Sequence, residues 1–390
     1  MGESVLKLGG KVIEITNLQQ SRGLLFAVST NPQLPMVLRK ERAFLVTNAV
    51  IPDGFSHYIF LDQNSNRSKE LAADTSFSII PDDYSYLGDK DIVRLSSDRQ
   101  MIRVLFRASS PHNSLLLTEQ CNNYCLMCSQ PPKAIDDSWI FDEVEQLIKL
   151  IPRETLEIGF TGGEPTLFGD RLLNLIRLAK NYLPNTALHL LSNGRRFSDY
   201  AYSARYADIQ HHDLMVGIPV YSDDPAGHDY VVQAKGAFDE TVRGVLNLKR
   251  LEQKVEIRVV LHKQTVDRLP KLASFIARNL LFVDHVALMG LEITGFTRAN
   301  LDSLWIDPYT YKDTLSEAVA ILNSYGMNVS VYNHQLCIVN DNIRPAYRKS
   351  ISDWKNEYVP ECRGCTKKPE CGGFFSSSRQ YRYSDFIRPF

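Results

Sequence analysis

The sequence lacks the features that mark a membrane, secreted or nucleic-acid-binding protein. Among its 390 residues, Lys and Arg number 44 and Asp and Glu 45, and a formal net charge of −1 gives no electrostatic reason to bind nucleic acid or an anionic membrane. No apolar run approaches the length that a membrane helix needs. The segment Met1–Gly10 lacks the basic, apolar and small-residue pattern of a secretory signal. We therefore expect a cytoplasmic protein without membrane contact.

Cysteine is absent from residues 1–120, although the chain has seven. In the cytoplasm, cysteines are more often metal ligands than disulfide partners. The seven are split into a group of three and a group of four, which is what one metal site with an open position and one fully ligated site would use. The three are Cys121, Cys125 and Cys128, and the four are Cys337, Cys362, Cys365 and Cys371.

The first three cysteines have the spacing C-x3-C-x2-C and directly follow the apolar run Ser114–Leu117. Three thiolates on one short loop can hold three corners of an iron–sulfur cube and leave the fourth iron without a protein ligand. Substrates or cofactors bind at an open iron, so this spacing favours a reactive cluster. The alternative is a zinc knot, but zinc sites usually use C-x2-C pairs and four ligands, and this loop has neither a second pair nor a histidine.

Residues 1–110 predict a small β-rich domain, because short apolar or alternating runs are separated by turn residues and no long amphipathic helix is evident. It has no catalytic constellation. If this domain has a function of its own, we expect it to bind an extended peptide along a sheet edge. We prefer the alternative, a structural cover for the catalytic domain, because a free edge cannot be seen from sequence. The predicted strands are Lys11–Ile15, Leu24–Val28, Phe44–Val50 and Tyr58–Leu61, with a hairpin of Asp91–Leu95 and Met101–Phe106.

Residues 111–305 alternate short apolar strands with amphipathic helices, which predicts an α/β fold with a parallel sheet. Six such units fall short of the eight that close a full barrel, so we predict a partial (β/α)6 TIM-type barrel with its site at the C-terminal ends of the strands. The predicted strands are Ser114–Thr118, Leu156–Phe160, Ala187–Leu191, Met215–Val220, Val255–Leu261 and His285–Leu291. The predicted helices are Phe141–Leu150, Arg171–Tyr182, Phe238–Leu251 and Leu269–Leu280.

Polar and glycine-rich motifs follow successive strands of this predicted sheet. The second strand ends in Gly162–Pro165 (Gly-Gly-Glu-Pro), the third in Ser192–Gly194 (Ser-Asn-Gly) and the fourth near Ser222, and the fifth carries Arg258. Each alone is a weak signal, since such motifs also form ordinary turns and Arg258 could pair with Glu256 on a surface strand. Their recurrence at one edge of one sheet favours a shared binding site.

Together, the cysteine spacing and the motifs after the second and third strands resemble the radical S-adenosylmethionine (SAM) superfamily. The resemblance implies a [4Fe–4S] cluster on Cys121, Cys125 and Cys128, with SAM chelating the fourth iron. An electron from an external donor would cleave SAM to methionine and a 5′-deoxyadenosyl radical, which abstracts hydrogen from the substrate. The residue before the last cysteine is often aromatic in that family, whereas here it is Met127, whose thioether can pack on adenine. The SAM-binding residues so implied are Met127, Gly162, Gly163, Glu164, Pro165, Ser192, Asn193, Ser222 and Arg258.

The last part of the chain, residues 306–390, predicts a helix over Pro308–Tyr325, a strand over Met327–Val331 and then a metal site on Cys337, Cys362, Cys365 and Cys371. Four thiolates can close either a cluster or a tetrahedral zinc. The spacing C-x2-C-x5-C followed by glycines resembles the auxiliary-cluster extensions (twitch and SPASM types) of peptide-modifying radical SAM enzymes. This resemblance implies an auxiliary-cluster domain with a second [4Fe–4S] cluster, with zinc as the rival.

The segment Thr118–Pro132 and the closing Cys-Gly-Gly-Phe-Phe resemble the C component of the His-Xaa-Ser system, a group of paired radical SAM maturases. That resemblance implies an enzyme that modifies a ribosomally made peptide beside a second maturase. Two alternatives stay open. One is a radical SAM enzyme acting on a small molecule or on RNA, although neutral net charge makes nucleic acid a poor substrate. The other is a non-catalytic iron–sulfur protein for electron transfer or assembly, which would not need Gly-Gly-Glu-Pro.

Overall fold

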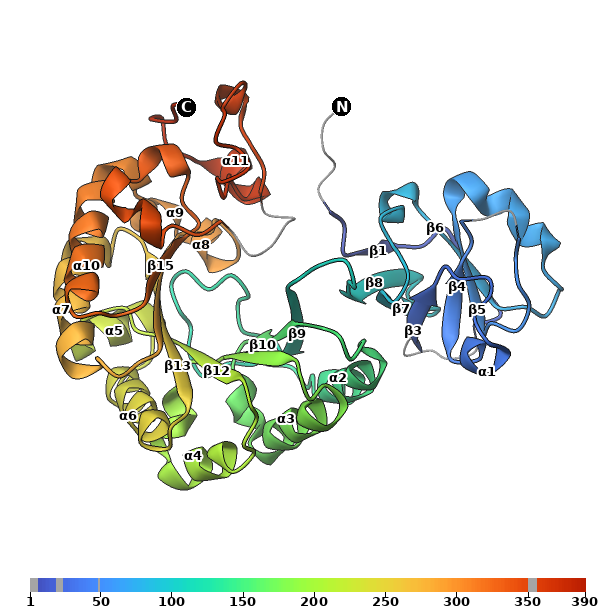
Figure 1. Cartoon of the computed structure of the whole chain (residues 1–390), viewed down its shortest axis with the longest axis horizontal. Coiled ribbons are helices and arrows are strands. Elements are labelled where there is room, and N and C mark those ends of the chain that lie inside the picture. The colour runs from blue at the N-terminus through green and yellow to red at the C-terminus, as the bar shows by residue number, and fades with distance from the viewer. Residues whose placement is uncertain (1–5, 19–23, 48–49, 350–355) are drawn as a thin grey trace. The chain divides into compact units, whose positions relative to one another are not determined.

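The computed structural model describes residues 6–18, 24–47, 50–349 and 356–390 (Figure 1). Its contacts divide the chain into two compact units. The first comprises Met1–Leu115, Asp142–Ile158 and Leu178–Thr186, and the second comprises Leu116–Phe141, Gly159–Arg177 and Ala187–Phe390. The domain boundaries at 110/111 and 305/306 remain a prediction.

In the described part of the N-terminal region, eight strands form one mixed sheet in the order β1-β8-β7-β3-β4-β5-β6-β2. The predicted β-rich character is confirmed, including the antiparallel hairpin of β7 and β8. Strand β6 was not predicted, and the strand predicted over Phe44–Val50 is shorter, with residues 48–49 outside the described residues. The elements are β1 Gly9–Lys11, β2 Glu14–Thr16, β3 Leu24–Ser29, α1 Met36–Arg39, β4 Arg42–Leu45, β5 His57–Leu61, β6 Phe77–Ile80, β7 Ile92–Ser96 and β8 Met101–Phe106.

The two edges of this sheet meet at Val12 and Ile13. The prediction of one strand over Lys11–Ile15 is wrong, because β1 pairs with β8 at one edge and β2 pairs with β6 at the other. Between them, the Val12 N–H donates to the Gln100 carbonyl at 2.9 Å and the Ile13 N–H donates to the Ile79 carbonyl at 2.8 Å. One bent segment thus supplies the outermost strand at both ends of the sheet order, with three residue pairs on each side.

A second sheet, with seven strands among the described residues, runs in the order β15-β14-β13-β12-β11-β10-β9. Every pairing recorded from β11 to β15 is parallel, which confirms the predicted α/β fold with a parallel sheet. Figure 1 shows α6, α7 and α10 on the outer side of this curved sheet. The strands are β9 Asn113–Thr118, β10 Glu157–Gly162, β11 Ala187–Leu191, β12 Leu214–Pro219, β13 Lys254–Leu261, β14 His285–Gly290 and β15 Val329–Tyr332.

The seventh strand corrects the prediction of six units. β15 was predicted as a strand of the C-terminal region, but it pairs with β14, from Val286↔Val329 to Met289↔Tyr332. The helix α10 between these two strands makes one more strand–helix–strand unit, so the sheet extends into residues assigned to the auxiliary domain. The helices are α2 Trp139–Leu150, α3 Asp170–Tyr182, α4 Tyr200–Ala207, α5 Pro225–Val232, α6 Ala237–Arg250, α7 Leu269–Asn279, α8 Phe296–Ala299, α9 Leu301–Leu304, α10 Lys312–Ser324 and α11 Ser376–Tyr381.

Helical periodicity explains why these segments cover the sheet. In α6, Phe238, Thr241, Val245 and Leu248 are buried, a spacing of three or four residues that places them on one side of the helix. The short helices α4 and α5 were not predicted, because two turns hold too few apolar repeats to show a period. Within the described ranges, every helix is too short or too polar to cross a membrane.

Candidate functional site

The three-cysteine loop follows β9 and is fixed at its base by a buried carboxylate, Asp137, which is 1% exposed. Its oxygens accept hydrogen bonds from the Thr118 hydroxyl at 3.0 and 3.1 Å, from the Glu119 N–H at 2.5 Å and from the Gln120 amide at 2.9 Å. The three residues before Cys121 are thereby held in one conformation. Asp137 was not predicted, because an aspartate in a polar stretch has no local signal of its partners.

Gly162 and Gly163 let the end of β10 lie directly against this loop. A Cβ added to Gly163 would lie 2.1 Å from the Gln120 carbonyl oxygen, and one added to Gly162 (φ +149°) would lie 2.4 Å from the Thr118 oxygen. In their place, the Gly163 and Glu164 N–H groups donate to the Thr118 and Gln120 carbonyls, each at 2.8 Å. The glycine pair is therefore required by close backbone approach, not only by a turn.

Glu164 connects β10 to the Ser-Asn-Gly motif after β11. Its side chain is fully buried, and its carboxylate accepts from the Thr166 N–H and hydroxyl at 3.0 and 2.6 Å, from the Ser192 hydroxyl at 2.9 Å and from the Asn193 N–H at 2.6 Å. Burial raises the pKa of Glu164, and these donors oppose the rise. Pro165, also buried, begins the helical turn that follows. Two predicted motifs are thus brought together in one hydrogen-bonded network.

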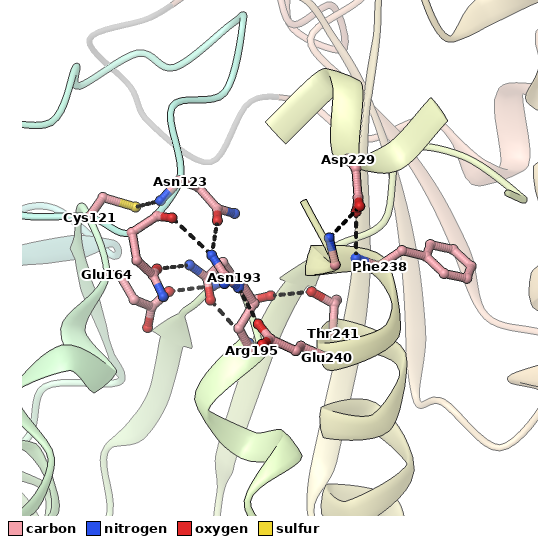
Figure 2. A network of polar contacts seen from close by, with 12 residues as sticks. Cys121, Asn123, Glu164, Asn193, Arg195, Asp229, Phe238, Glu240 and Thr241 are labelled. Carbon is pink, nitrogen blue, oxygen red and sulfur yellow. Dashed lines mark hydrogen bonds and ion pairs between the residues drawn. The ribbon is translucent and has the colours of Figure 1, made fainter. Parts of the chain in front are cut away.

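Asn193 and Arg195 extend this network to the cysteine loop (Figure 2). The Asn193 amide donates to the Asn122 side-chain oxygen at 2.7 Å. Arg195 donates through one Nη1 to the Asn122 carbonyl at 2.9 Å and to the Asn123 side-chain oxygen at 2.8 Å, while its Nε donates to Glu240 on α6 at 2.6 Å. Sequence reasoning missed Arg195 and Glu240, which are 45 residues apart and have no shared motif.

The orientation of α6 is itself fixed by a side chain of α5. Asp229 accepts hydrogen bonds from the Gly236 and Phe238 N–H groups at the start of α6, and Figure 2 shows it pointing at these amides. In the first turn of α6, the Thr241 hydroxyl donates to the Asn193 carbonyl at 3.0 Å. Glu240 is therefore presented to Arg195 by a capped and docked helix end.

The far end of the cysteine loop is held by residues 295–300, which follow β14. Three consecutive loop carbonyls accept hydrogen bonds from this segment, and a Cβ on Gly295 (φ +51°) would lie 2.3 Å from the Cys128 oxygen. The contacts are the Phe296 N–H to Cys128 at 2.8 Å, the Thr297 hydroxyl to Met127 at 3.2 Å and the Asn300 amide to Leu126 at 2.8 Å. No sequence motif indicated this segment.

The remaining predicted SAM residues lie near the loop but outside this network. The Met127 side chain is 7% exposed and packs in an apolar cluster with Tyr221 and Val231. The Ser222 hydroxyl donates to Asp224, which caps α5, at 3.0 Å. Arg258 lies on the inner face of the sheet, opposite the side chains that pack on the helices. The SAM contacts predicted for these residues stay predictions.

Arg258 belongs to a charged cluster on this inner face. It donates to Glu256 at 2.8 Å, as the sequence suggested, and to the Met289 sulfur at 3.2 Å. The other Glu256 oxygen contacts His285 Nδ1 at 2.6 Å, and His285 Nε2 contacts the Ser330 hydroxyl at 2.9 Å. Burial would raise the pKa of Glu256, but the His285 and Arg258 contacts outweigh it and lower the pKa to about 2. The inner face thus carries a fixed carboxylate at neutral pH.

The cysteine loop has the chemistry that an iron–sulfur cluster needs. Burial raises the pKa of Cys121 to about 11, with Glu164 and Cys128 adding to the rise, and it also raises the pKa values of Cys125 and Cys128. The Asn123 N–H donates to the Cys121 sulfur at 3.4 Å, a contact that stabilises a thiolate. Cys121, Cys125 and Cys128 form no disulfide bond. Among the described residues, no three His, Cys, Asp or Glu side chains form a group that could hold a metal ion. Three partly buried sulfurs become thiolates together only beside compensating positive charge, so the loop fits a cationic cluster.

The other four cysteines meet at a second place in the same unit. Cys337, Cys362, Cys365 and Cys371 all line one pocket, together with Tyr358 and Phe390. The Cys371 sulfur accepts N–H bonds from Leu336 and Gly373, each at 3.4 Å. Burial raises the pKa values of Cys337 and Cys362, with the neighbouring cysteines adding to the rise. This donor set fits a fully ligated metal site, and cluster and zinc both remain compatible with it.

A comparison with known protein families finds a match in the central part of the chain. Residues 115–276 match the model of the Radical SAM superfamily. Cys121, Cys125, Cys128 and both hydrogen-bonded motifs lie within the matched residues. The match covers less than half of the chain, and it shows that this region is similar to the radical SAM superfamily. The family implies a [4Fe–4S] cluster and SAM as cofactors.

Several solved structures resemble the chain at low sequence identity, and no curated protein matches it. Streptococcus suis SuiB bound to the precursor peptide SuiA has a TM-score of 0.46 and 14% identity, covering 59% of this chain and 50% of SuiB. The enzyme anSMEcpe with AdoMet and the Cp18Cys peptide has a TM-score of 0.49 and 15% identity, covering 71% and 92%. Methylornithine synthase (PylB) has a TM-score of 0.40 and 13% identity, covering 57% and 70%. The match thus spans about half the length of SuiB.

Proposed function

We propose that this protein is a radical SAM enzyme, and that it is a peptide maturase that abstracts hydrogen from a ribosomally made peptide of the His-Xaa-Ser type. When bound, the cluster and SAM would supply the 5′-deoxyadenosyl radical that abstracts hydrogen. The work of the chain is to hold the cofactors, orient the peptide and exclude water.

The observation that carries the peptide proposal is the second cysteine site. Four cysteines line a pocket of their own after the parallel sheet, in the same unit as the three-cysteine loop. In sequence, this arrangement resembles the auxiliary-cluster extensions of peptide-modifying radical SAM enzymes. We infer that Cys337, Cys362, Cys365 and Cys371 hold an auxiliary [4Fe–4S] cluster.

SAM would bind over the carboxyl ends of the strands, on the residues that already surround the cysteine loop. The backbone of Gly162–Pro165 is proposed to hold the methionyl amino group, and Ser192 and Asn193 the ribose. The Glu164 carboxylate accepts four hydrogen bonds of 3.0 Å or less, so its role is to align Gly162–Pro165 with Ser192–Gly194. SAM would then contact the backbone of these aligned motifs. Met127, Ser222 and Arg258 remain proposed SAM contacts.

A pocket beside the strand ends is the proposed entry for the peptide. It lies between Leu261 and Gly290, at the ends of β13 and β14, and the segment Gly372–Phe375, directly after the last cysteine. Trp305 and Tyr311 add aromatic surface, and the Arg382 guanidinium stacks 4.2 Å over the Trp305 ring. Arg382 is the only charged side chain among the described residues that line this pocket. Aromatic walls with one cation suit a peptide segment that presents an apolar side chain and a carbonyl or carboxylate.

Co-expression followed by mass spectrometry tests the proposal. The protein would be produced with a histidine- and serine-rich precursor peptide, with and without a second maturase, and the peptide mass compared with that from a Cys125→Ala strain. We expect a mass change that needs intact Cys125. An unchanged peptide, with SAM cleavage intact in the same preparation, would reject the peptide assignment while leaving the radical SAM chemistry standing.

A further inference from the structure

Arg195 is the one cation in direct hydrogen-bond contact with the cysteine loop among the described contacts, and no predicted motif contains it. Its side chain is only 16% exposed, whereas the neighbouring Arg196 is exposed and lies over the Tyr202 ring at 5.3 Å. Gly194, in the left-handed region at φ +80°, turns the chain between Asn193 and Arg195. The turn at Gly194 therefore fixes the position of the Arg195 guanidinium.

The Asn122 carbonyl oxygen and the Asn123 N–H, which connect Arg195 to Cys121, belong to one peptide bond. Arg195 Nη1 donates to the Asn122 carbonyl oxygen at 2.9 Å, and the N–H of the same peptide unit, that of Asn123, donates to the Cys121 sulfur at 3.4 Å. A charged donor on the oxygen polarises the peptide and strengthens the bond that its N–H makes, because linked hydrogen bonds reinforce one another. Figure 2 shows Arg195, Asn123 and Cys121 in this arrangement.

We propose that Arg195 is a positioning residue that raises the reduction potential of the cluster on Cys121, Cys125 and Cys128 by polarising the Asn122–Asn123 peptide toward the Cys121 sulfur. Hydrogen bonds to cluster sulfurs and nearby charge both set the potential of such clusters. The inference rests on the cluster assigned to this loop and does not depend on the peptide substrate.

Glu240 sets the strength of this effect. It pairs with the opposite edge of the guanidinium at 2.6 Å and is 46% exposed, so it partly neutralises Arg195 without touching the loop. Removing the positive charge should lower the potential, and removing the opposing negative charge should raise it. If the Arg195–Glu240 ion pair only packed against the loop, removing either partner would loosen the loop in the same way. Both variants would then shift the reduction potential in the same direction.

The test is a potentiometric titration of the anaerobically reconstituted protein, followed by electron paramagnetic resonance. The signal that changes on addition of SAM reports the Cys121 loop and separates it from any second cluster. We expect Arg195→Gln to lower the equilibrium constant for reduction about tenfold, a shift of about 59 mV for one electron. Glu240→Gln should shift the potential upward, Arg195→Lys should recover part of the loss, and the matched control Arg196→Gln should equal wild type.

Equal potentials for wild type and both variants, or shifts of the same sign in Arg195→Gln and Glu240→Gln, would overturn the proposal. If Arg195→Gln takes up no iron, Glu240→Gln decides alone, since it keeps the guanidinium in place: an upward shift supports the inference and any other result rejects it. Iron content is measured on each variant. Absence of a SAM-sensitive signal in wild type would instead refute the cluster assignment itself.

Discussion

Replacing Gly163 with alanine tests whether close approach of β10 positions the cysteine loop. The new Cβ would lie 2.1 Å from the Gln120 oxygen and 2.6 Å from its carbonyl carbon. Ordinary contact begins near 3.4 Å, so the loop and the strand end must separate by about 1.3 Å. That movement breaks two backbone hydrogen bonds of 2.8 Å, those of Gly163 to Thr118 and of Glu164 to Gln120. Overpacking of 1–3 kcal/mol and about 1 kcal/mol for each bond give a loss of about 3–5 kcal/mol.

The assay is denaturant unfolding with hydrogen exchange, which resolves peptides from each unit, together with iron content after anaerobic reconstitution. Two glycines serve as controls because an added Cβ meets nothing within 4 Å. Gly88→Ala should change the unfolding free energy by less than about 0.5 kcal/mol. Gly169→Ala, at φ +51° and ψ −117°, should cost about 1–3 kcal/mol from backbone strain alone. If Gly163→Ala were no worse than Gly169→Ala and kept its iron, the account of the glycine pair would be refuted.

Three further outcomes follow from the structure. Glu164→Ala leaves four donor groups without their acceptor and should lower the unfolding free energy by about 3–5 kcal/mol. Ser192→Ala removes one of these donors and should lower it by about 1–2 kcal/mol. Equal losses in the two variants would contradict the claim that Glu164 joins the two motifs. Burial lowers the pKa of His57 from 6.5 to about 3, so the first unit should keep its full stability above pH 6.5 and lose on the order of 4 kcal/mol as the pH falls toward 3. His57→Gln should flatten this unfolding profile and the exposed His212→Gln should not; an unaltered slope in His57→Gln would refute it. Replacing all three cysteines of residues 121–128 should leave one iron–sulfur cluster by iron and absorbance analysis, and zinc without iron would reject the auxiliary cluster.

The sequence predicted the parallel strands and the motifs at their ends because both signals are local. Apolar runs of four to eight residues marked β9 to β14, and the convergence of Gly162–Pro165 with Ser192–Gly194 follows from strand order alone. The number of strands was harder to predict. β15 lies next to the auxiliary cysteines in sequence, and only its pairing with β14 assigns it to the sheet.

The contacts that hold the cysteine loop could not be predicted, because each partner was selected by tertiary position. Asp137, Arg195 and the segment 295–300 come from three separate parts of the chain, and none has a spacing relation to the cysteines. The wrong prediction for the N-terminal sheet has the same cause, because strand pairing there also depends on tertiary position. Nothing local in Lys11–Ile15 shows that its halves pair with strands at opposite edges.

The central claim is that Cys121, Cys125 and Cys128 form a SAM-cleaving centre. Anaerobic incubation of the reconstituted protein with SAM and a strong reductant, followed by chromatography for 5′-deoxyadenosine, tests it most directly. We predict 5′-deoxyadenosine from the wild type, none from Cys125→Ala, and production retained in Cys365→Ala. Absence of the product from fully iron-loaded wild type, with or without peptide, would contradict the claim.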